Sequence, residues 1–281
     1  MRAPVQTGLG SPRKGDARMN PKLRTARIVL PVVMGVLCLV AWEAIVRGLR
    51  ISPHILPGPA DIGRALVEDW PLLSAALWVT LKITASAFVS AVLVGGAIAI
   101  LFSLSKWIEL TFFPYAVIMQ VTPVVAIAPL LIIWVDNVQV ALLICAWLVA
   151  FFPILSNTIV GLNSADHNLR DLFRLYGATP GQTLRRLRIP SAMPYFLAGV
   201  RISGGLSLIG AVVAEFVAGA GGQGSGLAYR ILEAGYQLKT PRMFAALLMI
   251  SCAGVLIFLA TSWVSQRILR RWHESAMERE S

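Results

Sequence analysis

One glycine-rich stretch of this 281-residue chain has a composition that could bind a phosphate. Residues 219–226 read GAGGQGSG, which has the glycine content of a phosphate-binding loop but lacks the Gly-Lys-Ser/Thr ending that supplies the phosphate lysine. No Walker motif occurs elsewhere in the sequence, so the chain is not expected to hydrolyse ATP. A flexible loop is the simpler interpretation of residues 219–226.

The sequence gives little indication of a metal site or of a catalytic nucleophile. The three cysteines lie far apart inside apolar runs, the three histidines are scattered, and no CxxC or Cys/His ligand spacing occurs. Buried cysteine behaves as a small hydrophobic residue. We therefore expect no catalytic residue, no metal site and no cofactor bound by this chain, and we do not expect an enzyme.

The segment RDLFRLYGATPGQTLRRLRIP at residues 170–190 has the signals of two short helices. Ser164 is expected to cap the first helix and Gly177 to end it, because glycine adopts the left-handed conformation that other residues resist. Thr179 and Gln182 can form a capping box at the start of the second helix.

Proline residues are expected to set both ends of this second helix. Pro180 suits its first position, where the missing N–H has no partner in any case, and Pro190 is expected to end it. The arm is cationic through Arg185, Arg186 and Arg188. Residues 164–190 are therefore predicted to form a compact helix–turn–helix hairpin, which is more structured than a connecting loop requires.

The apolar runs around this hairpin are long enough to cross a membrane. Hydrophobic residues make up 57% of the chain and charged residues 14%, with a mean hydropathy of +0.71, whereas soluble domains are about one-quarter charged. A spanning helix needs about 20 apolar residues. Six spans are expected, at residues 28–46, 83–105, 110–135, 137–162, 195–217 and 243–266. The fold class is therefore predicted to be an all-α integral membrane protein.

Basic residues cluster just outside the apolar runs, which is typical of membrane topology and not of a nucleic-acid-binding surface. The 25 Lys and Arg against 14 Asp and Glu give a net charge of +11. Most of the basic residues lie inside if the N-terminus is cytoplasmic. Both termini and residues 164–190 are then expected in the cytoplasm, with residues 49–75 and 218–242 outside.

The hairpin resembles the cytoplasmic loop signature of ABC importer permeases. That signature is Glu-Ala-Ala, three residues, Gly, nine residues and then Ile-x-Leu-Pro. Asp171-Leu172-Phe173 stands at the place of Glu-Ala-Ala, Gly177 follows after three residues, and Leu187-Arg188-Ile189-Pro190 follows after nine more. The glycine and the closing proline match the signature, whereas Leu172 and Phe173 are bulkier than the alanines, so the contact can differ in detail.

The resemblance extends over about residues 76–273 and is to the nitrate/sulfonate/taurine-type permeases. The stretches that carry it are ILPGPADI at 55–62, VTPVVAIAPLLIIW at 121–134, FFPILSNTIVGL at 151–162 and AVVAEFVAGAGGQGSGLAYRI at 211–231. Permeases for pyrimidine precursors or flavins share much of this pattern, including PRMFAAL at 241–247 and WHES at 272–275. The solute is not fixed by the resemblance.

The resemblance implies a fold of the type I ABC importer kind and a bacterial inner-membrane location. It implies three protein partners: a cytoplasmic ABC ATPase dimer that uses ATP, an extracytoplasmic solute-binding protein, and a second copy of the chain. The solute is expected to be a sulfonate-, taurine- or nitrate-type anion, or a pyrimidine or vitamin precursor. The residues that the resemblance places at the ATPase contact are Asp171, Leu172, Phe173, Gly177, Ala178, Arg185, Ile189 and Pro190.

Ionisable residues within spans are costly and usually functional. Glu43 and Arg47 are four residues apart and are expected to pair. Arg201 is expected to extend towards the cytoplasmic surface, too far along the helix to reach Glu215. The candidates for the solute pathway or its gate are Ser207, Glu215 and Phe216. Contact with the binding protein and helix packing are the alternatives for Glu215.

Two backbone features are expected to shape the spans. Pro123 and Pro129 should kink the third span, and the glycine pairs 95–96 and 204–205 should permit close approach of helices. A secondary active transporter with no ATPase is the alternative function. That class often shows inverted repeats and a charged site at the membrane midplane, and the sequence shows neither clearly.

The expected organisation has four parts. They are a basic cytoplasmic tail at 1–27, a first spanning helix and outside loop at 28–75, a permease core at 76–266 and a basic cytoplasmic tail at 267–281. Either Met1 or Met19 can be the first residue of the protein, because residues 1–18 are a polar stretch without structural signals.

Overall fold

The computed structural model describes residues 21–219 and 225–277, without the side chains of 21–28 and 271–277. The possible start at Met19, the middle of GAGGQGSG and the last four residues lie outside the described residues. The chain forms two units, residues 1–51 and residues 52–281, and each is considered by itself.

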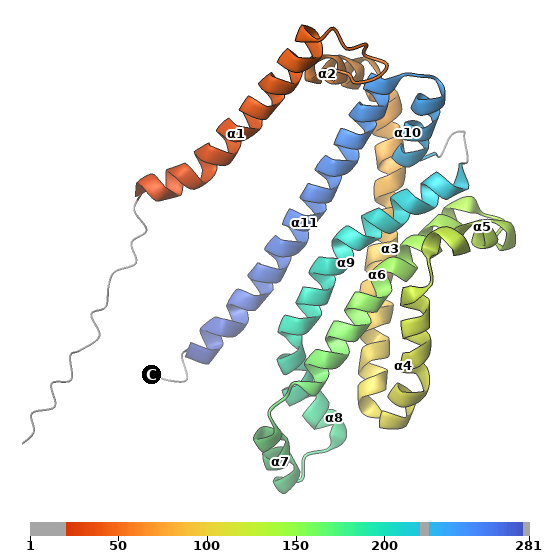
Figure 1. The fold of residues 1–281 in the computed structure, drawn as a ribbon. Helices are drawn as coiled ribbons and strands as arrows, with labels where there is room; N and C mark the ends of the chain where they lie inside the picture. The colour runs from red at the N-terminus through yellow and green to blue at the C-terminus, as the bar shows by residue number, and fades with distance from the viewer. Residues whose placement is uncertain (1–20, 220–224, 278–281) are drawn as a thin grey trace, which may run out of the picture. The chain divides into compact units, whose positions relative to one another are not determined.

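All regular secondary structure in the described part of the chain is helical, as predicted (Figure 1). In the first unit the helix is α1 (Pro21–Gly48). The elements of the second unit are α2 (Pro59–Glu68), α3 (Trp70–Leu104), α4 (Lys106–Val121), α5 (Val124–Trp134), α6 (Val138–Asn163), α7 (His167–Leu175), α8 (Pro180–Thr183), a π-helical turn η1 (Leu184–Arg188), α9 (Ile189–Ala218), α10 (Leu227–Tyr236) and α11 (Thr240–Met277).

Among the described residues, five helices are long and apolar enough to cross a membrane. They correspond to five of the six predicted spans, although α3 and α11 extend well beyond the apolar runs. In α1, the Arg47 Nε lies 2.5 Å from the Glu43 carboxylate, which confirms the predicted pair.

The predicted third span is broken into α4 and α5. The two helices pass the same hydropathy test together but are bent by 98°, so they form either a broken span or a re-entrant loop. The break lies at Thr122 and Pro123, and Thr122 is extended there, because the residue before a proline avoids the helical conformation. Pro129 lies inside α5 without ending it, so only the first of the two prolines breaks the span.

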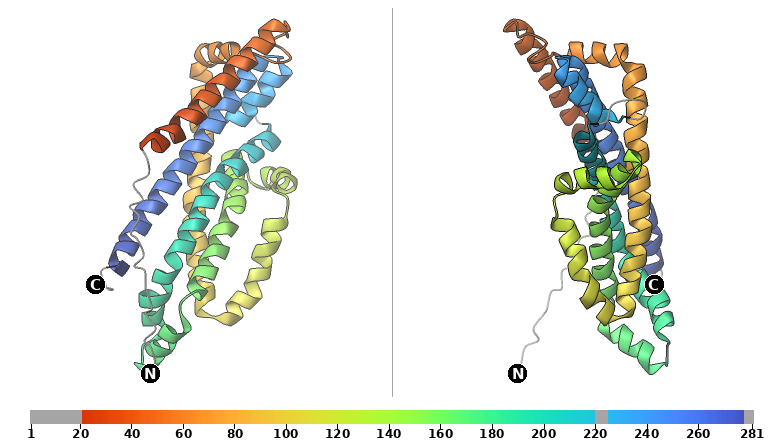
Figure 2. Two further views of the ribbon diagram at one scale, coloured as in Figure 1. Left: turned by 60° about the vertical axis from the view of Figure 1, so that its left-hand side comes forward. Right: turned by 90° about the vertical axis from the view of Figure 1, so that its right-hand side faces the viewer.

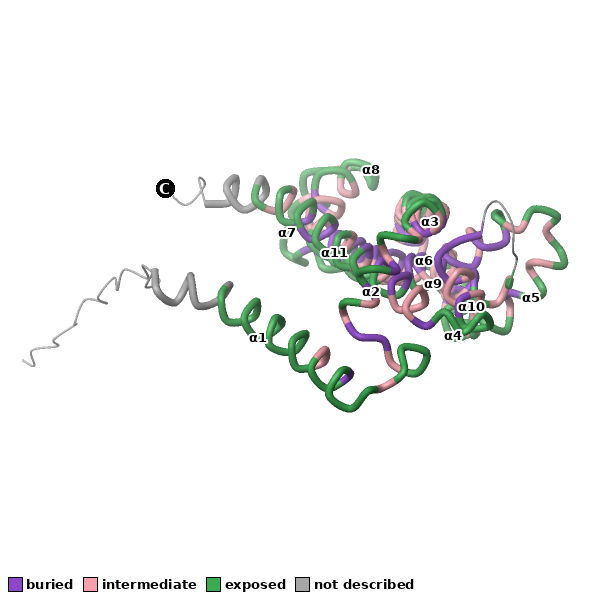
Figure 3. Tube along the Cα trace, turned by 90° about the horizontal axis from the view of Figure 1, so that it is seen from above, coloured by how far each residue is buried: buried purple, intermediate pink, exposed green. Residues whose placement is uncertain are grey.

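The core of the second unit lies where α3, α6 and α9 pack along one another (Figures 1 and 2). Its buried positions are rich in alanine, and they gather on these helices and on α10 (Figure 3). The Ser203 hydroxyl on α9 donates a buried hydrogen bond of 2.6 Å to the Ala150 carbonyl on α6. Small residues let helices approach this closely. In lipid, where the hydrophobic effect does not drive helices together, this close packing holds them in contact.

Glycine lies at some of the closest approaches, but not at all the expected ones. A Cβ on Gly204 would lie 2.8 Å from the Thr261 Cγ2, and one on Gly95 would lie 3.2 Å from the Ile154 Cγ2, whereas Gly205 has open space. Close approaches of α6 and α9 that were not expected from the sequence lie at Gly199, where a Cβ would lie 2.8 Å from the Pro153 carbonyl oxygen, and at Gly161, where a Cβ would lie 2.7 Å from the Tyr195 Cβ.

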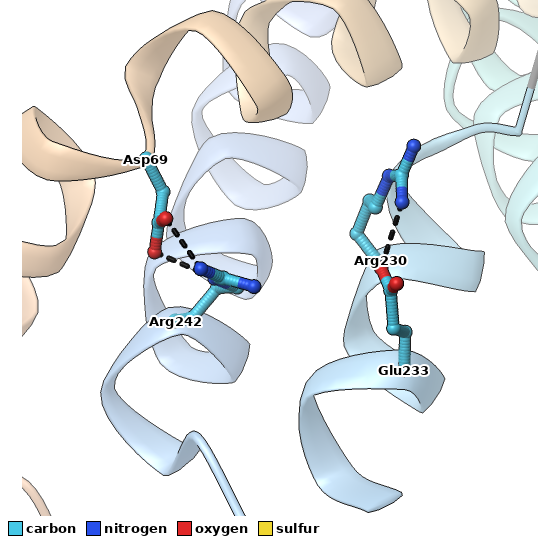
Figure 4. Close-up of polar contacts among 4 residues, drawn as sticks. All are labelled: Asp69, Arg230, Glu233 and Arg242. Atoms are coloured by element: carbon cyan, nitrogen blue, oxygen red, sulfur yellow. Dashed lines mark hydrogen bonds and ion pairs between the residues drawn. The ribbon is translucent and has the colours of Figure 1, made fainter. Parts of the chain in front are cut away.

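An ion pair joins the start of α11 to the junction of α2 and α3 (Figure 4). The Arg242 Nε and Nη2 lie 2.6 and 2.5 Å from the two Asp69 carboxylate oxygens. The two side chains are 17% and 21% exposed, so solvent screens the pair only in part. A bidentate, partly desolvated pair is stronger than an ordinary surface ion pair.

Removing either partner of this pair is expected to destabilise the second unit. Asp69→Asn and Arg242→Gln should each lower the free energy of unfolding by about 1–3 kcal/mol, because the remaining charge loses its partner. The double variant should lose less than the sum of the two. Thermal unfolding of the purified chain measures all three, with the exposed Arg64→Gln as control. Additive losses would contradict a direct pair.

Candidate functional site

The first arm of the hairpin is α7, and it begins at a different residue from the one expected. Asp166 is its N-cap, and the Asp166 carboxylate accepts a hydrogen bond of 2.7 Å from the Asn168 N–H. The prediction of Ser164 as the cap was wrong, since Ser164 ends α6 and donates to the Gly161 carbonyl. A carboxylate is favoured at this position because the N-terminus of a helix is partially positive.

The turn of the hairpin is formed by Gly177, whose φ of +67° confirms the predicted left-handed conformation. Its N–H donates to the Arg174 carbonyl at 3.0 Å, and the Ala178 N–H donates to the Phe173 carbonyl at 2.9 Å. This pair of bonds is a Schellman motif, which satisfies carbonyls at a helix C-terminus. A Cβ at position 177 would meet nothing within 4 Å, so the glycine is required for its backbone conformation and not for space.

The second arm begins with the predicted capping box. The Gln182 N–H donates to the Thr179 hydroxyl at 3.3 Å, and the Thr179 N–H donates to the Gln182 side-chain oxygen at 2.8 Å. Pro180 occupies the first turn, as expected. The turn between the two arms is thus fixed by hydrogen bonds on both sides.

The second arm does not end at Pro190, and that prediction was wrong. α8 continues through η1 into α9, and the Ile189 N–H donates to the Leu184 carbonyl across the π turn. Pro190 follows directly on this turn, where the hydrogen-bond register changes and one carbonyl loses its partner in any case. Residues 180–218 therefore form one continuous helical element, so the hairpin is an extension of a spanning helix.

The tip of the hairpin presents apolar side chains on its surface. Leu175 and Tyr176 are 85% and 83% exposed, and Leu172 is 44% exposed. Exposed apolar side chains at a rigid turn are typical of a surface that a partner covers.

The eight residues assigned to a partner contact from the sequence fall into two groups. The exposed ones are Asp171, Leu172, Gly177 and Arg185. The partly buried ones are Phe173, Ala178, Ile189 and Pro190. Ile189 packs against the core of the spans, so the closing Ile-Pro pair belongs to the junction of the hairpin with α9 and not to its exposed tip.

Arg188 joins the hairpin to two other spans. Its guanidinium donates to the Ser103 carbonyl at 2.7 Å, the Leu162 carbonyl at 3.0 Å and the Asn163 side-chain oxygen at 3.0 Å. These acceptors lie at the C-terminal ends of α3 and α6, where carbonyls lack partners within the helix. From the sequence, Arg188 is assigned only to a cationic arm, because no neighbouring residue indicates acceptors on other helices.

A buried polar cluster lies at the other end of α9. Glu215 is 2% exposed, and its carboxylate accepts hydrogen bonds from the Thr80 hydroxyl at 2.8 Å and the Ala228 N–H at 3.0 Å. The Thr80 hydroxyl in turn accepts from the Leu227 N–H at 2.9 Å. The carboxylate thus lies against the N-terminus of α10, where negative charge is favoured. We call these four residues the Glu215 cluster.

The cluster leaves little freedom at the entry to α10. A Cβ on Gly226 would overlap the Glu215 carboxylate, so only glycine fits there. α10 itself packs on α11, α9 and α3. The Glu215 cluster therefore fixes α10 to the end of the same helix that begins in the hairpin.

The three candidates for the pathway or gate have different surroundings in the structure. Ser207 is fully buried and donates to the Gly204 carbonyl at 2.9 Å, Glu215 is held in its cluster, and Phe216 is 37% exposed. Glu215 thus joins α9 to α3 and α10 in this structure, and its part in the pathway or gate stays a prediction. Arg201 lies with its guanidinium 4.7 Å from the centre of the Phe258 ring on α11.

Residues 91–270 match the protein family described as binding-protein-dependent transport system inner membrane component. The chain belongs to this family. The permease is 32% identical over 269 residues to the riboflavin transport system permease of Chloroflexus aurantiacus, covering 92% of this chain and 97% of the relative. It is 30% identical over 252 residues to the formylaminopyrimidine transport permease of Halalkalibacterium halodurans, covering 89% and 98%. Other relatives are named for taurine and nitrate transport.

The fold of the permease is that of a type I ABC importer subunit. It is similar to a solved amino acid ABC transporter described as having histidines, with a TM-score of 0.59 and 21% identity, covering 73% of this chain and 96% of that one. The prediction of the family and of its fold from the hairpin signature and the spans is confirmed. Among the residues that the structure describes, no group of His, Cys, Asp and Glu could hold a metal ion.

Proposed function

We propose that the permease moves a small solute across the bacterial inner membrane as the spanning subunit of an ATP-driven importer. Its expected partners are a cytoplasmic ABC ATPase dimer, an extracytoplasmic binding protein and a second copy of itself. ATP is used by the ATPase, and this chain binds no cofactor. The observation that carries the proposal is the hairpin, a capped and rigid turn that continues without a break into a spanning helix.

The proposed mechanism follows from that continuity. An ATPase that closes on the exposed residues of the hairpin moves α8, η1 and α9 as one element, and Arg188 transmits the movement to the ends of α3 and α6. At the far end of α9 the Glu215 cluster carries the movement to α10. A continuous helix can pass a displacement from one end to the other. Packed helices shift between distinct arrangements and do not absorb the displacement by gradual deformation.

The proposed orientation places the hairpin and both termini in the cytoplasm. The positive-inside rule supports this orientation, because most of the lysines and arginines then lie on the cytoplasmic side.

The test of the proposed function is association with an ATPase. The permease, purified with its neighbouring gene products in mild detergent, should retain an ABC ATPase and hydrolyse ATP faster when loaded binding protein is added. Transport into vesicles should stop when the ATPase is omitted. Transport that continues without any ATPase would instead establish the alternative, a secondary active transporter.

The solute class is best decided on the binding protein, because that partner delivers the solute. Relatives are named for flavin and pyrimidine-precursor transport and for taurine and nitrate transport. A thermal-shift screen of the binding protein should include riboflavin, hydroxymethylpyrimidine and thiamine against taurine, alkanesulfonates and nitrate. A shift with an anion directs mutagenesis to Arg201, and a shift with a heterocycle directs it to aromatic residues such as Phe216.

A further inference from the structure

A cavity of about 300 Å³ lies between the hairpin and the end of α3. Its lining combines Ser103 and Leu104 at the end of α3 with residues of both hairpin arms. Three of the lining side chains are the arginines 170, 174 and 188, and none of the lining residues is acidic. A concave site with three guanidinium groups attracts an anion.

The hydrogen-bonding capacity of these arginines is only partly used. Arg188 is engaged with the ends of α3 and α6. The Arg170 Nη2 donates to the Asn163 carbonyl at 3.0 Å, but its buried Nε has no hydrogen-bond partner. Arg174 reaches the Asp171 carboxylate at 3.6 Å, and both side chains are largely exposed, so solvent weakens this pair. The unused donors belong to Arg170 and Arg174.

The arginine cavity lies away from the exposed apolar tip of the hairpin. Arg170 and Arg174 are one turn apart on α7 and share a face, whereas Leu172 and Leu175 fall on the opposite face. The lining residues place the arginine face beside α3, and the exposure of the leucines places the other face towards solvent. Of the eight residues assigned to the ATPase contact, Ala178 alone lines the cavity, so the anion site borders that surface and its arginines lie outside it.

The position of the cavity along the spans points to the source of the anion. Ser103 and Leu104 end the apolar helix α3, and Leu162 and Asn163 end α6, so the cavity lies at the level where the hydrocarbon region stops. Leu104 and the adjacent Trp107 are 56% and 81% exposed. Tryptophan is enriched at the membrane interface, and an exposed apolar surface beside a basic cavity suits an acyl chain with its headgroup in the cavity.

We propose that the arginine cavity binds the phosphate of an anionic phospholipid headgroup from the cytoplasmic leaflet. The proposal rests on the proposed function for its orientation. Basic pockets between spanning helices on the cytoplasmic side are suited to such headgroups. A phosphate held by Arg170 and Arg174 bridges α7 to the end of α3, so it holds the hairpin in one position. Coupling of ATP hydrolysis to transport then depends on anionic lipid.

The test measures bound lipid on the complete transporter and on the permease purified alone. Both are placed in nanodiscs of phosphatidylcholine containing phosphatidylglycerol, and lipid that stays bound after transfer to detergent is quantified by native mass spectrometry. Arg174→Gln and Arg170→Gln should each lower bound phosphatidylglycerol about fivefold, the effect of one basic residue at an anionic membrane surface. Arg186→Gln, which removes an exposed arginine of the same hairpin outside the cavity, should retain it.

Four outcomes would overturn the proposal. The first is equal lipid retention in the wild type and in the Arg170 and Arg174 variants. The second is an equal loss in Arg186→Gln, which would mean non-specific attraction to charge. The third is displacement of the lipid by millimolar inorganic phosphate with no preference for the phospholipid. A loss of ATPase association with unchanged lipid binding would assign these arginines to the ATPase contact and also overturn it.

The same nanodiscs separate this proposal from the proposed function. In phosphatidylcholine alone, the wild-type transporter should keep its ATPase but lose most of the stimulation of ATP hydrolysis by loaded binding protein. Adding phosphatidylglycerol should restore stimulation in the wild type and in Arg186→Gln, and not in Arg174→Gln. Failure of the proposed function appears differently, as a permease that never retains an ATPase in any lipid.

Discussion

Replacing Gly177 by valine is expected to weaken binding of the ATPase at least about fivefold while leaving the spans folded. Gly177 has a φ of +67°, and a β-branched residue in this conformation is strained by about 1–3 kcal/mol. The hairpin can relieve that strain only by giving up the Schellman bonds to Arg174 and Phe173. Because about 1.4 kcal/mol corresponds to a tenfold change in population, the docking-competent hairpin becomes a minor state.

The control for this prediction is Gly177→Asn. A Cβ at position 177 meets nothing within 4 Å, so both substitutions fit in space and differ only in backbone preference. Asparagine tolerates the left-handed conformation better than other residues, and it should keep most of the binding. The measurement is ATPase retained on the immobilised permease across a range of ATPase concentrations, together with the Tm of the permease. Equal losses in the two variants would show that the side chain, and not the turn, is responsible.

Replacing Glu215 by alanine is expected to release α10 from the end of α9. The variant leaves the buried Ala228 N–H without an acceptor and opens a space where the carboxylate lay, which together should cost about 2–4 kcal/mol. The Thr80 hydroxyl loses less, because it also reaches the Ala76 carbonyl at 3.3 Å. Thr80→Val should cost about 1–3 kcal/mol, because it leaves the buried Leu227 N–H without its acceptor.

Thiol labelling reports the position of α10 directly. Ala228 is fully buried, so a cysteine placed there by Ala228→Cys, with the three native cysteines replaced, should be protected from maleimide in the otherwise unchanged permease. With Glu215→Ala added, labelling should rise at least tenfold. Phe216→Ala, one residue further along α9 and exposed, should leave the cysteine protected. Protection that persists in Glu215→Ala would mean that packing on α11, α9 and α3 holds α10 without the carboxylate.

Loss of the Glu215 cluster is also expected to uncouple the two ends of α9. ATPase binding should persist, because the hairpin is intact in this variant, while transport falls. This separation of binding from transport distinguishes Glu215→Ala from Gly177→Val, in which binding itself is lost. If ATPase binding and transport both fell, Glu215 would contribute to the general stability of the fold and not to the transmission of movement along α9.

Local signals in the sequence predicted local structure well. The capping box of Thr179 and Gln182 and the left-handed Gly177 depend on residues within one or two turns of each other, so their types and spacing are sufficient. The five unbroken spans were predictable for a similar reason, because the bilayer sets the length of an apolar run. Pro123 was correctly expected to disturb the third span, but the 98° break was not foreseen.

Two local predictions failed because a stronger neighbour competed. Ser164 has the right chemistry for an N-cap, but α6 continues up to it and Asp166 offers a carboxylate to the next helix. Pro190 was expected to stop a helix, but the preceding π turn shifts the hydrogen-bond register and accommodates it. Ser164 and Pro190 are clear signals in the sequence. The length of α6 and the π turn, which decided the outcome, have no comparably clear signal.

The sequence by itself determined the family, the number of apolar runs and the chemistry of the hairpin turn. Only the tertiary structure decided which distant groups meet. Glu215 is hydrogen-bonded to Thr80, 135 residues away in the sequence, and Arg188 is hydrogen-bonded to the Ser103 carbonyl, 85 residues away. Such partners depend on how α3, α6 and α9 pack, and packing is set by many small contacts together and not by any residue pattern. Glu215 could be singled out from the sequence because it is an ionisable residue within a span. Its contact with α10 could not, because that contact depends on the packing of the helices.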